Sequence, residues 1–472
     1  MGSEPRHAVE LDEHDPRPLE ASGMSGLRFA APDYSALHEA MLREADRETC
    51  AIAFAYPNPA CDAWVVAPPG VELVPESAYE RRDATSAVLS PAFLVDLANR
   101  ARAQSLGLVL AHTHPRSKGA PVFSPVDDAG EAEIKSYLER RAPDSAPLAM
   151  VVGPDGCRCR KLGSTTEVPV WEVGETVKLM SDAGPSSAAA AHDRQVRAFG
   201  AAGQAILSKL HVAVVGGGGT GSVVVQQLAH LGVRRLTIID PDDVETTNLN
   251  RLVGAGPADI GTAKVKVARR TVLAVNPDAQ VEAVVGDIVD HAIAQRLASF
   301  DFVFLCTDSH ASRAVVGQSA YQHLVPTIDM GVSITVGAAG VEYVTGRVQM
   351  LAPGATCLSC TRALDGELIR REMMTPEQRA ADPYVQGVHE PQPAVISLNS
   401  TMASLAVTMF LGALTPIPAQ ARFQLYDGVR GTVRPTVARA NPTCIVCSRE
   451  GALAKGTSWP LPVRPQEPRG GR

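Results

Sequence analysis

The sequence lacks three features that would place it in a common class. No apolar run approaches the roughly 20 residues that span a bilayer, and the N-terminal residues contain no apolar segment of a secretory signal. There is also no basic block, because 44 Lys and Arg are interspersed with 51 Asp and Glu, for a formal net charge of −7. We therefore expect a cytoplasmic protein that binds neither membranes nor nucleic acids.

Cysteine is scarce, and its spacing is informative. The chain has nine cysteines, an odd number, and four of them form two C-x-x-C pairs, Cys357 with Cys360 and Cys444 with Cys447. In a reducing compartment such pairs are typical of metal binding rather than of disulfides. Four thiolates would close a tetrahedral zinc site without an open position, so we expect a structural zinc. Two unrelated metal knuckles are the alternative.

The length of 472 residues predicts two domains joined by a linker. The run SDAGPSSAAAA, which begins at Ser181, has the small residues, Gly and Pro of a linker. Both ends of the chain contain Pro and charge without periodicity, which is typical of disorder. On both sides of the linker, short apolar runs alternate with helical patterns, so both domains are predicted to be α/β. The predicted division is a disordered N-terminus 1–23, a first domain 24–180, a linker 181–192, a second domain 193–451 and a disordered tail 452–472.

The first domain contains a predicted metal site. His112 and His114 lie two residues apart at the end of an apolar run, so both imidazoles point to the same face of a strand. Ser124 and Pro125 are typical of a helix N-cap and first turn, which can direct Asp127 toward the two histidines. Two imidazoles and a carboxylate, with a fourth position for water, are the ligands of a catalytic zinc. The alternative is a surface turn followed by an ordinary helix start.

Hydrolysis at such a site needs a general base near the zinc-bound water. Glu48 precedes a second apolar run and is our candidate, although Glu44 would take its place if that strand began elsewhere. These residues resemble the JAMM/MPN zinc metalloprotease family, whose pattern is an upstream glutamate, H-x-H-P and S-x-x-D. The resemblance covers about residues 25 to 178 and implies that the Ser124 hydroxyl stabilises the oxyanion. The nine residues between His114 and Ser124 are a longer spacing than the family usually has.

The second domain begins with a G-x-G-x-x-G motif between an apolar run and a helical pattern. Gly216, Gly218 and Gly221 make the motif, and Gly219 lies within it. Glycines allow the backbone to approach a phosphate, which the free N–H groups of the helix N-terminus can bind. Asp240 ends the next apolar run, where a carboxylate would bind a ribose. These features alone are equally typical of an NAD-dependent dehydrogenase.

The residues that follow favour chemistry at phosphorus. Polar and charged side chains gather beyond this run and on the next predicted helix: Asp242, Asn248, Arg251 and Lys264. Fixed cations stabilise the negative charge of a pentacoordinate phosphorus, whereas a hydride transfer has little use for them. Asp308 ends a later apolar run, where it would hold Mg²⁺, and Arg313 is assigned to a salt bridge.

These segments resemble the family of ubiquitin-activating enzymes and their bacterial relatives ThiF and MoeB, from about Asp193 to Arg449. The resemblance implies a Rossmann-like parallel-sheet domain that uses ATP and Mg²⁺ to adenylate the C-terminal carboxylate of a ubiquitin-like, β-grasp protein. It implies ribose binding by Asp240, phosphate binding by Asn248, Arg251 and Lys264, and magnesium binding by Asp308. It also implies a homodimer, because Arg194 resembles an arginine that reaches the neighbouring subunit's site. Arg197 is an equal candidate for that role.

The stretch between Cys360 and Cys444 contains no cysteine, whereas family members that form a thioester or persulfide carry one there. We therefore expect the reaction to end at an acyl-adenylate or to pass to a partner's nucleophile, with the Thr375 hydroxyl as an alternative. Our leading hypothesis is a bacterial ubiquitin-like conjugation or antiviral-defence enzyme that adenylates its β-grasp partner and processes or removes it with a zinc isopeptidase. A conjugating enzyme is a further candidate partner. The alternatives are activation and release of a sulfur-carrier protein in cofactor or cysteine synthesis, and a scaffold without catalysis.

Overall fold

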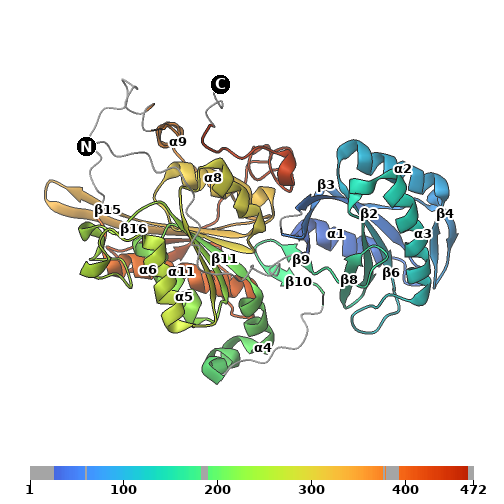
Figure 1. The fold of residues 1–472 in the computed structure, drawn as a ribbon, viewed down its shortest axis with the longest axis horizontal. Helices are drawn as coiled ribbons and strands as arrows, with labels where there is room; N and C mark the ends of the chain where they lie inside the picture. Colours follow the sequence, from blue (N-terminus) through green and yellow to red (C-terminus); the bar gives the residue numbers. More distant parts are fainter. Residues whose placement is uncertain (1–25, 59–60, 182–189, 376–377, 379–392, 466–472) are drawn as a thin grey trace.

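The computed structural model describes residues 26–58, 61–181, 190–375, 378 and 393–465, which form two α/β lobes. Each lobe is built on one eight-stranded sheet. Figure 1 shows the lobes side by side, with the N-terminal lobe on the right and the second lobe on the left. Most of the predicted linker falls on residues 182–189, outside the described part of the chain.

The first lobe is a mixed sheet with helices on both faces. Its strands are β1 (Gly26–Ala30), β2 (Cys50–Asn58), β3 (Ala63–Leu73), β4 (Tyr79–Arg82), β5 (Ala87–Leu89), β6 (Gly107–Thr113), β7 (Leu148–Gly153), β8 (Gly156–Lys161), β9 (Val170–Val173) and β10 (Val177–Leu179). Its helices are α1 (Ala31–Met41), α2 (Pro91–Gln104) and α3 (Pro125–Arg141). The strand order is β10-β9-β1-β3-β2-β6-β7-β8, and β4 and β5 form a separate pair. Successive side chains of a strand point to opposite faces, so Ile52 packs in one core with α2 and α3 while Ala53 packs in another with α1.

The second lobe contains a parallel sheet that continues into an antiparallel one. Its strands are β11 (His211–Val215), β12 (Arg235–Asp240), β13 (Gln280–Val285), β14 (Phe302–Leu305), β15 (Thr327–Gly337), β16 (Gly340–Leu351), β17 (Phe423–Asp427) and β18 (Thr432–Pro435). Its helices are α4 (Asp193–Lys209), α5 (Gly219–His230), α6 (Lys264–Val275), α7 (His291–Ala294), α8 (His310–Gln322), α9 (Gly366–Glu372) and α11 (Ile396–Leu414). The strand order is β13-β12-β11-β14-β15-β16-β17-β18, and the first five are parallel. The predicted Rossmann-like parallel sheet is therefore confirmed.

The position of the candidate site follows from this strand order. After β11 the chain adds β12 and β13 on one side and then returns to add β14 on the other. Such a reversal opens a crevice at the carboxyl ends of the two strands beside it, and ligands of open α/β sheets bind there.

One helix departs from our sequence-based expectation. By length and composition α11, with 19 residues, is apolar enough to cross a membrane, although we expected no such run. Met402, Ala406 and Phe410 of this helix are buried in the main core of the second lobe, and the helix contacts α5, β15 and β16. Packing inside the lobe accounts for the apolar side chains that face the core.

The predicted disordered tail is wrong for residues 452–465. Ala454 is buried in the main core, and Leu461 packs against the core beside β14. The side-chain amide of Gln322 donates a hydrogen bond of 2.7 Å to the carbonyl of Trp459. Composition predicted disorder because this segment is rich in Pro, but its few apolar residues pack against the second lobe.

The two lobes share a buried interface centred on Arg28 of β1. This side chain is only 1% exposed and lies 3.9 Å from Asp301 of the second lobe. It donates hydrogen bonds to the carbonyls of Ala298, Phe300 and His323 at 3.2–3.4 Å. A buried guanidinium needs such partners, so this contact fixes the lobes relative to each other.

Candidate functional site

The glycine turn between β11 and α5 lies where the strand order reverses, at the carboxyl end of β11. Gly216 has a φ of 96°, and a Cβ there would lie 2.9–3.1 Å from the backbone of Cys306 and Thr307. A Cβ at Gly221 would collide with the Gly216 carbonyl. Around Gly218, by contrast, a Cβ would meet nothing within 4 Å. Two glycines are thus required by the tight turn, and the third leaves the N-terminal end of α5 open to a ligand.

Asp240 at the end of β12 holds this turn in place. Its two carboxylate oxygens accept the N–H groups of Gly217 at 2.6 Å and Asp242 at 2.9 Å. Burial raises the pKa of this carboxyl, while Lys264 and the two N–H groups oppose the rise. The observed role of Asp240 is therefore to position the glycine turn, and its contact with a ribose stays a prediction.

Two cations flank the turn. Lys264 starts α6, its side chain lies beside Gly217, and its Nζ is 2.7 Å from an oxygen of Asp242. Side-chain carbons of Arg251 lie close to Gly219, because a Cβ at this glycine would be 3.2 Å from them. The predicted phosphate-binding cations therefore approach the glycine turn at two positions, Gly217 and Gly219.

The other predicted nucleotide residues are less directly placed. Asn248 is buried, and its side-chain oxygen accepts the N–H of Glu245 at 3.1 Å, so it caps a short turn. Arg194 is exposed on α4, and Arg197 pairs with Asp193 on the same helix at 2.8 Å. Phosphate binding by Asn248 and a role for either arginine in a second subunit stay predictions.

Asp308 follows β14, next to the residues that contact Gly216. Its side chain is exposed, and within the described residues its carboxylate makes no hydrogen bond or ion pair. Open carboxylate oxygens of this kind fit Mg²⁺, which prefers oxygen ligands. Arg313 donates to the Asp308 carbonyl at 3.3 Å and pairs with Asp329 at 3.0 Å, so its predicted salt bridge is present. Arg347 pairs with the second oxygen of Asp329.

Comparison with known proteins assigns this lobe. A family model described as the ThiF family matches residues 192–446, more than half of the chain. The chain belongs to the ThiF family. The glycine turn, Arg251, Lys264 and Asp308 all lie inside the matched segment. The Rossmann-like lobe is thus a ThiF-family adenylation domain, and the match does not extend to the first lobe.

Three curated relatives and one solved structure illustrate the likeness. Molybdopterin-synthase adenylyltransferase of Escherichia coli is 30% identical over 55% of this chain and 96% of the relative. Sulfur carrier protein adenylyltransferase of Thermus thermophilus is 30% identical over 53% and 87%. Ubiquitin-like modifier-activating enzyme 5 of Oryza sativa is 31% identical over 52% and 58%. A crystal structure of E. coli MccB with ATP has a TM-score of 0.44 at 19% identity, over 55% of this chain and 75% of that one.

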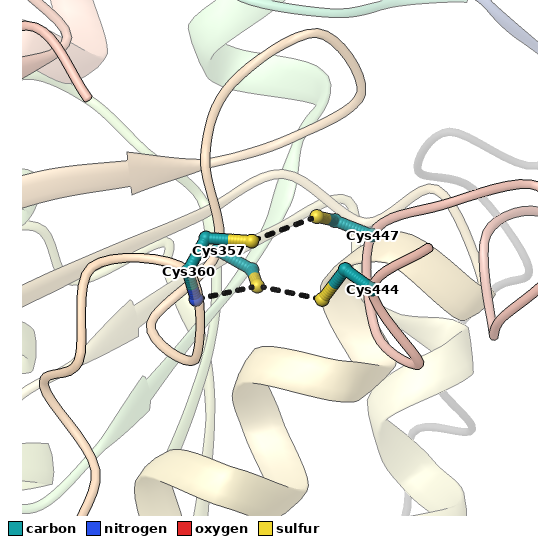
Figure 2. Close-up of side chains that lie close together, drawn as sticks. All are labelled: Cys357, Cys360, Cys444 and Cys447. Atoms are coloured by element: carbon teal, nitrogen blue, oxygen red, sulfur yellow. Dashed lines mark hydrogen bonds between the residues drawn. The ribbon is translucent and has the colours of Figure 1, made fainter. Parts of the chain in front are cut away.

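The ThiF-family lobe also contains the predicted four-cysteine cluster. Figure 2 shows the four thiols converging from two separate segments of the chain. Cys357 and Cys444 lie 3.5 Å apart between sulfur atoms, and Cys360 and Cys447 lie 3.6 Å apart. Four sulfurs around one zinc at about 2.3 Å would be about 3.8 Å from one another, so this donor set fits zinc. Hydrogen bonds from the neighbouring thiols, foremost Cys447, lower the pKa of Cys357, which favours the thiolate that a metal needs.

A second cluster lies in the first lobe, outside the ThiF match. Ligand atoms of His112, His114 and Asp127 all lie within 4.8 Å of one another. His112 lies near the end of β6 and His114 directly follows the strand, while Ser124 and Asp127 form a capping box at the start of α3. The Nε2 atom of His112 is buried without a hydrogen bond, although an oxygen of Asp127 lies 3.2 Å away. Two imidazoles and a carboxylate, with one buried nitrogen lacking a hydrogen bond, are a donor set that fits a metal ion.

Glu48 and an apolar cavity border this His–His–Asp cluster. Glu48 Oε1 lies 3.8 Å from His114 Nε2, and burial raises the pKa of this carboxyl while both histidines oppose the rise. Glu44 instead forms ion pairs with Arg47 and Arg82. A cavity of about 400 Å³ between α2, α3 and β5 is lined by Glu48, His112 and Asp127 and by apolar side chains. The cluster thus opens onto space that a peptide segment could enter.

Sequence reasoning missed residues that lie far along the chain from the motifs. The side-chain amide of Asn399 on α11 lies directly against Gly219. Glu372 of α9 binds the first turn of α8, beside Asp308. Neither residue belongs to a recognisable pattern, so only the folded arrangement reveals them.

Proposed function

We propose that the chain adenylates the C-terminal carboxylate of a ubiquitin-like or sulfur-carrier protein with Mg·ATP. The observation that carries this proposal is the arrangement of Lys264, Arg251 and the Asp308 turn around one glycine turn. The names of the relatives support it, since two are adenylyltransferases, one of them for a sulfur carrier protein, and the third is an activating enzyme for a ubiquitin-like modifier.

The residues suggest how the reaction is assisted. Lys264 forms an ion pair with Asp242, so a triphosphate that displaces Asp242 would receive a charge already positioned at the turn. Arg251 lies beside Gly219 of the same turn, where it would stabilise charge that develops on the α-phosphate. The N-terminal end of α5 adds N–H donors to the same phosphates.

Pyrophosphate exchange tests the adenylation proposal. The full chain, Mg·ATP and a β-grasp protein ending in glycine, encoded by a neighbouring gene, should exchange labelled pyrophosphate into ATP. Lys264→Ala should reduce the rate by about 100-fold, because a fixed charge at the transition state is lost. Lys266→Ala is the matched control, since this exposed lysine is two residues along the same helix. Equal rates for the two variants would contradict the proposal.

We propose a second activity for the first lobe, zinc-dependent hydrolysis of an amide bond at the C-terminus of the same partner. The supporting observation is the unpartnered Nε2 of His112 beside Asp127 and His114, with Glu48 and the cavity adjacent. A zinc held there would supply an activated water. Glu48 would take the proton from that water, and the cavity would hold the peptide in an extended form.

Mass spectrometry of the partner tests this second activity. A partner with a short C-terminal extension should be trimmed by the wild-type chain but not by Glu48→Gln, which keeps the side-chain shape and loses the base. Glu44→Gln is the control, because Glu44 faces Arg47 and Arg82 instead. Trimming by Glu48→Gln at the wild-type rate would exclude Glu48 as the base.

A further inference from the structure

The short helix α9 is attached to the first turn of α8 at the edge of the nucleotide site. An oxygen of Glu372 accepts the Ser309 hydroxyl and the N–H of Ala311, both at 2.7 Å. At the other end of α9, the N–H of Asp365 donates to Nδ1 of His310 at 3.1 Å. The contact is therefore specific and involves the residues that immediately follow Asp308.

Ser309 connects Glu372 to the Asp308 turn. The Ser309 hydroxyl caps α8 by accepting the N–H of Ser312 at 3.1 Å, and it gives its own proton to Glu372. The Ser309 N–H donates to the Thr307 hydroxyl at 3.0 Å. Asp308 thus lies between two residues of a hydrogen-bonded turn, and a carboxylate from a distant part of the chain completes that turn.

The direction of the Asp308 carboxylate depends on this backbone. Its side chain is exposed and has no hydrogen bond or ion pair of its own within the described residues. No side chain of the described residues holds this carboxylate, so its position relative to Gly216 depends on the backbone of the Thr307–Ser309 turn, where the Asp308 carbonyl also accepts from Arg313. A metal ligand that is fixed in advance loses less entropy on binding than a mobile one.

We infer that Glu372 is a positioning residue that holds Asp308 in the orientation needed to bind the magnesium of Mg·ATP. This inference rests on the proposed adenylation. In this arrangement Glu372 touches neither nucleotide nor metal and acts only through Ser309 and the first turn of α8. Loss of Glu372 should therefore weaken the binding of metal-bound ATP while leaving metal-free ATP unaffected.

The test measures ATP binding to the full chain by calorimetry, with Mn²⁺ as a paramagnetic substitute for Mg²⁺ and without added chelator. Glu372→Ala should weaken Mn·ATP binding at least fivefold and reduce the water-proton relaxation enhancement of bound Mn²⁺, with metal-free ATP binding within twofold of wild type. Glu372→Gln should stay within twofold of wild type for both, because its amide oxygen can accept the same two hydrogen bonds. Glu367→Ala is the matched control on α9, since Glu367 pairs only with Arg370 and Arg371 in the described chain.

Each other outcome has a defined meaning. If Glu372→Ala binds Mn·ATP like wild type, or weakens metal-free ATP equally, the inference is overturned and α9 is merely attached there. If Glu372→Gln fails as badly as Glu372→Ala, charge rather than hydrogen bonding matters and the inference is again overturned. If Glu372→Ala does not fold, Glu372→Asp replaces it, since the shorter side chain keeps the charge but retracts from Ala311. Absence of ATP binding by the wild type would instead overturn the proposed adenylation itself.

Discussion

The four-cysteine cluster and the His–His–Asp cluster differ in what surrounds them. The thiols of Cys357 and Cys444 are buried in a hydrophobic cluster with Tyr321 and Leu351, and they join two segments far apart in the chain. His112 and Asp127 instead line a cavity that opens from the first lobe. A closed site has no position for a substrate, so its metal stabilises the fold, whereas an open one keeps a position for water.

The difference indicates what stabilises the folded state of each half of the chain. A metal bound by all four thiols would tie Cys444 to Cys357 across 87 positions of the chain, in addition to the hydrophobic cluster that both residues occupy. The first half already has two hydrophobic cores of its own around β2 and β6. Metal loss should therefore affect stability in one half and activity in the other.

The largest expected effect comes from removing one ligand of each cluster. Cys444→Ser should lose one equivalent of zinc and destabilise the protein by on the order of 5 kcal/mol, because metal binding free energy is folding free energy at a structural site. His112→Ala should lose the other equivalent and all amide hydrolysis, with less than about 1 kcal/mol lost in stability. Elemental analysis and thermal unfolding measure both. Equal destabilisation by the two variants would mean that both metals are structural.

The next largest effect concerns the buried contact that joins the two lobes. Arg28→Met would leave the Asp301 carboxylate buried without its cation, which should cost about 3 kcal/mol or more. Because this residue fixes one lobe on the other, calorimetry should then resolve two unfolding transitions. Arg449→Ala is the control, since its ion pair with Asp33 also joins the lobes but Arg449 is 48% exposed. That variant should lose less stability than Arg28→Met, because solvent screens an ion pair with one half-exposed partner, and a similar loss in both would mean that Arg28 does not hold the lobes together.

The sequence predicts local geometry well and long-range contacts poorly, and the reason is physical. Residues two apart on a strand or three apart at a helix start have a fixed relative geometry, so His112 with His114 and Ser124 with Asp127 could be placed from spacing alone. The glycine turn is fixed in the same way by its backbone conformation.

Other residues depend on how distant segments fold together. Asn399 reaches Gly219 only because α11 packs on α5, and Glu372 reaches Ser309 only because α9 returns to α8. Arg28 lies in an ordinary strand pattern, and nothing near it in sequence indicates that it enters another lobe. Composition also failed for residues 452–465, because disorder depends on whether a complementary surface exists, which the tail sequence does not contain.

The last predicted effect concerns how acid destabilises the second lobe. Burial lowers the pKa of His211 to about 3 and of His323 to about 4, and both lie in the second lobe. The unfolded chain binds protons at both positions below a pKa of about 6.5, whereas the folded chain does not until lower pH. Stability is therefore fully present above pH 6.5 and falls as the pH decreases toward 4, by about 2 kcal/mol for each histidine at pH 5.

Urea unfolding at pH 7.5 and 5.0 measures the loss. His211→Gln should remove about half of the pH dependence, because glutamine takes up no proton. If His211→Gln keeps the full dependence, the acid sensitivity comes from other groups.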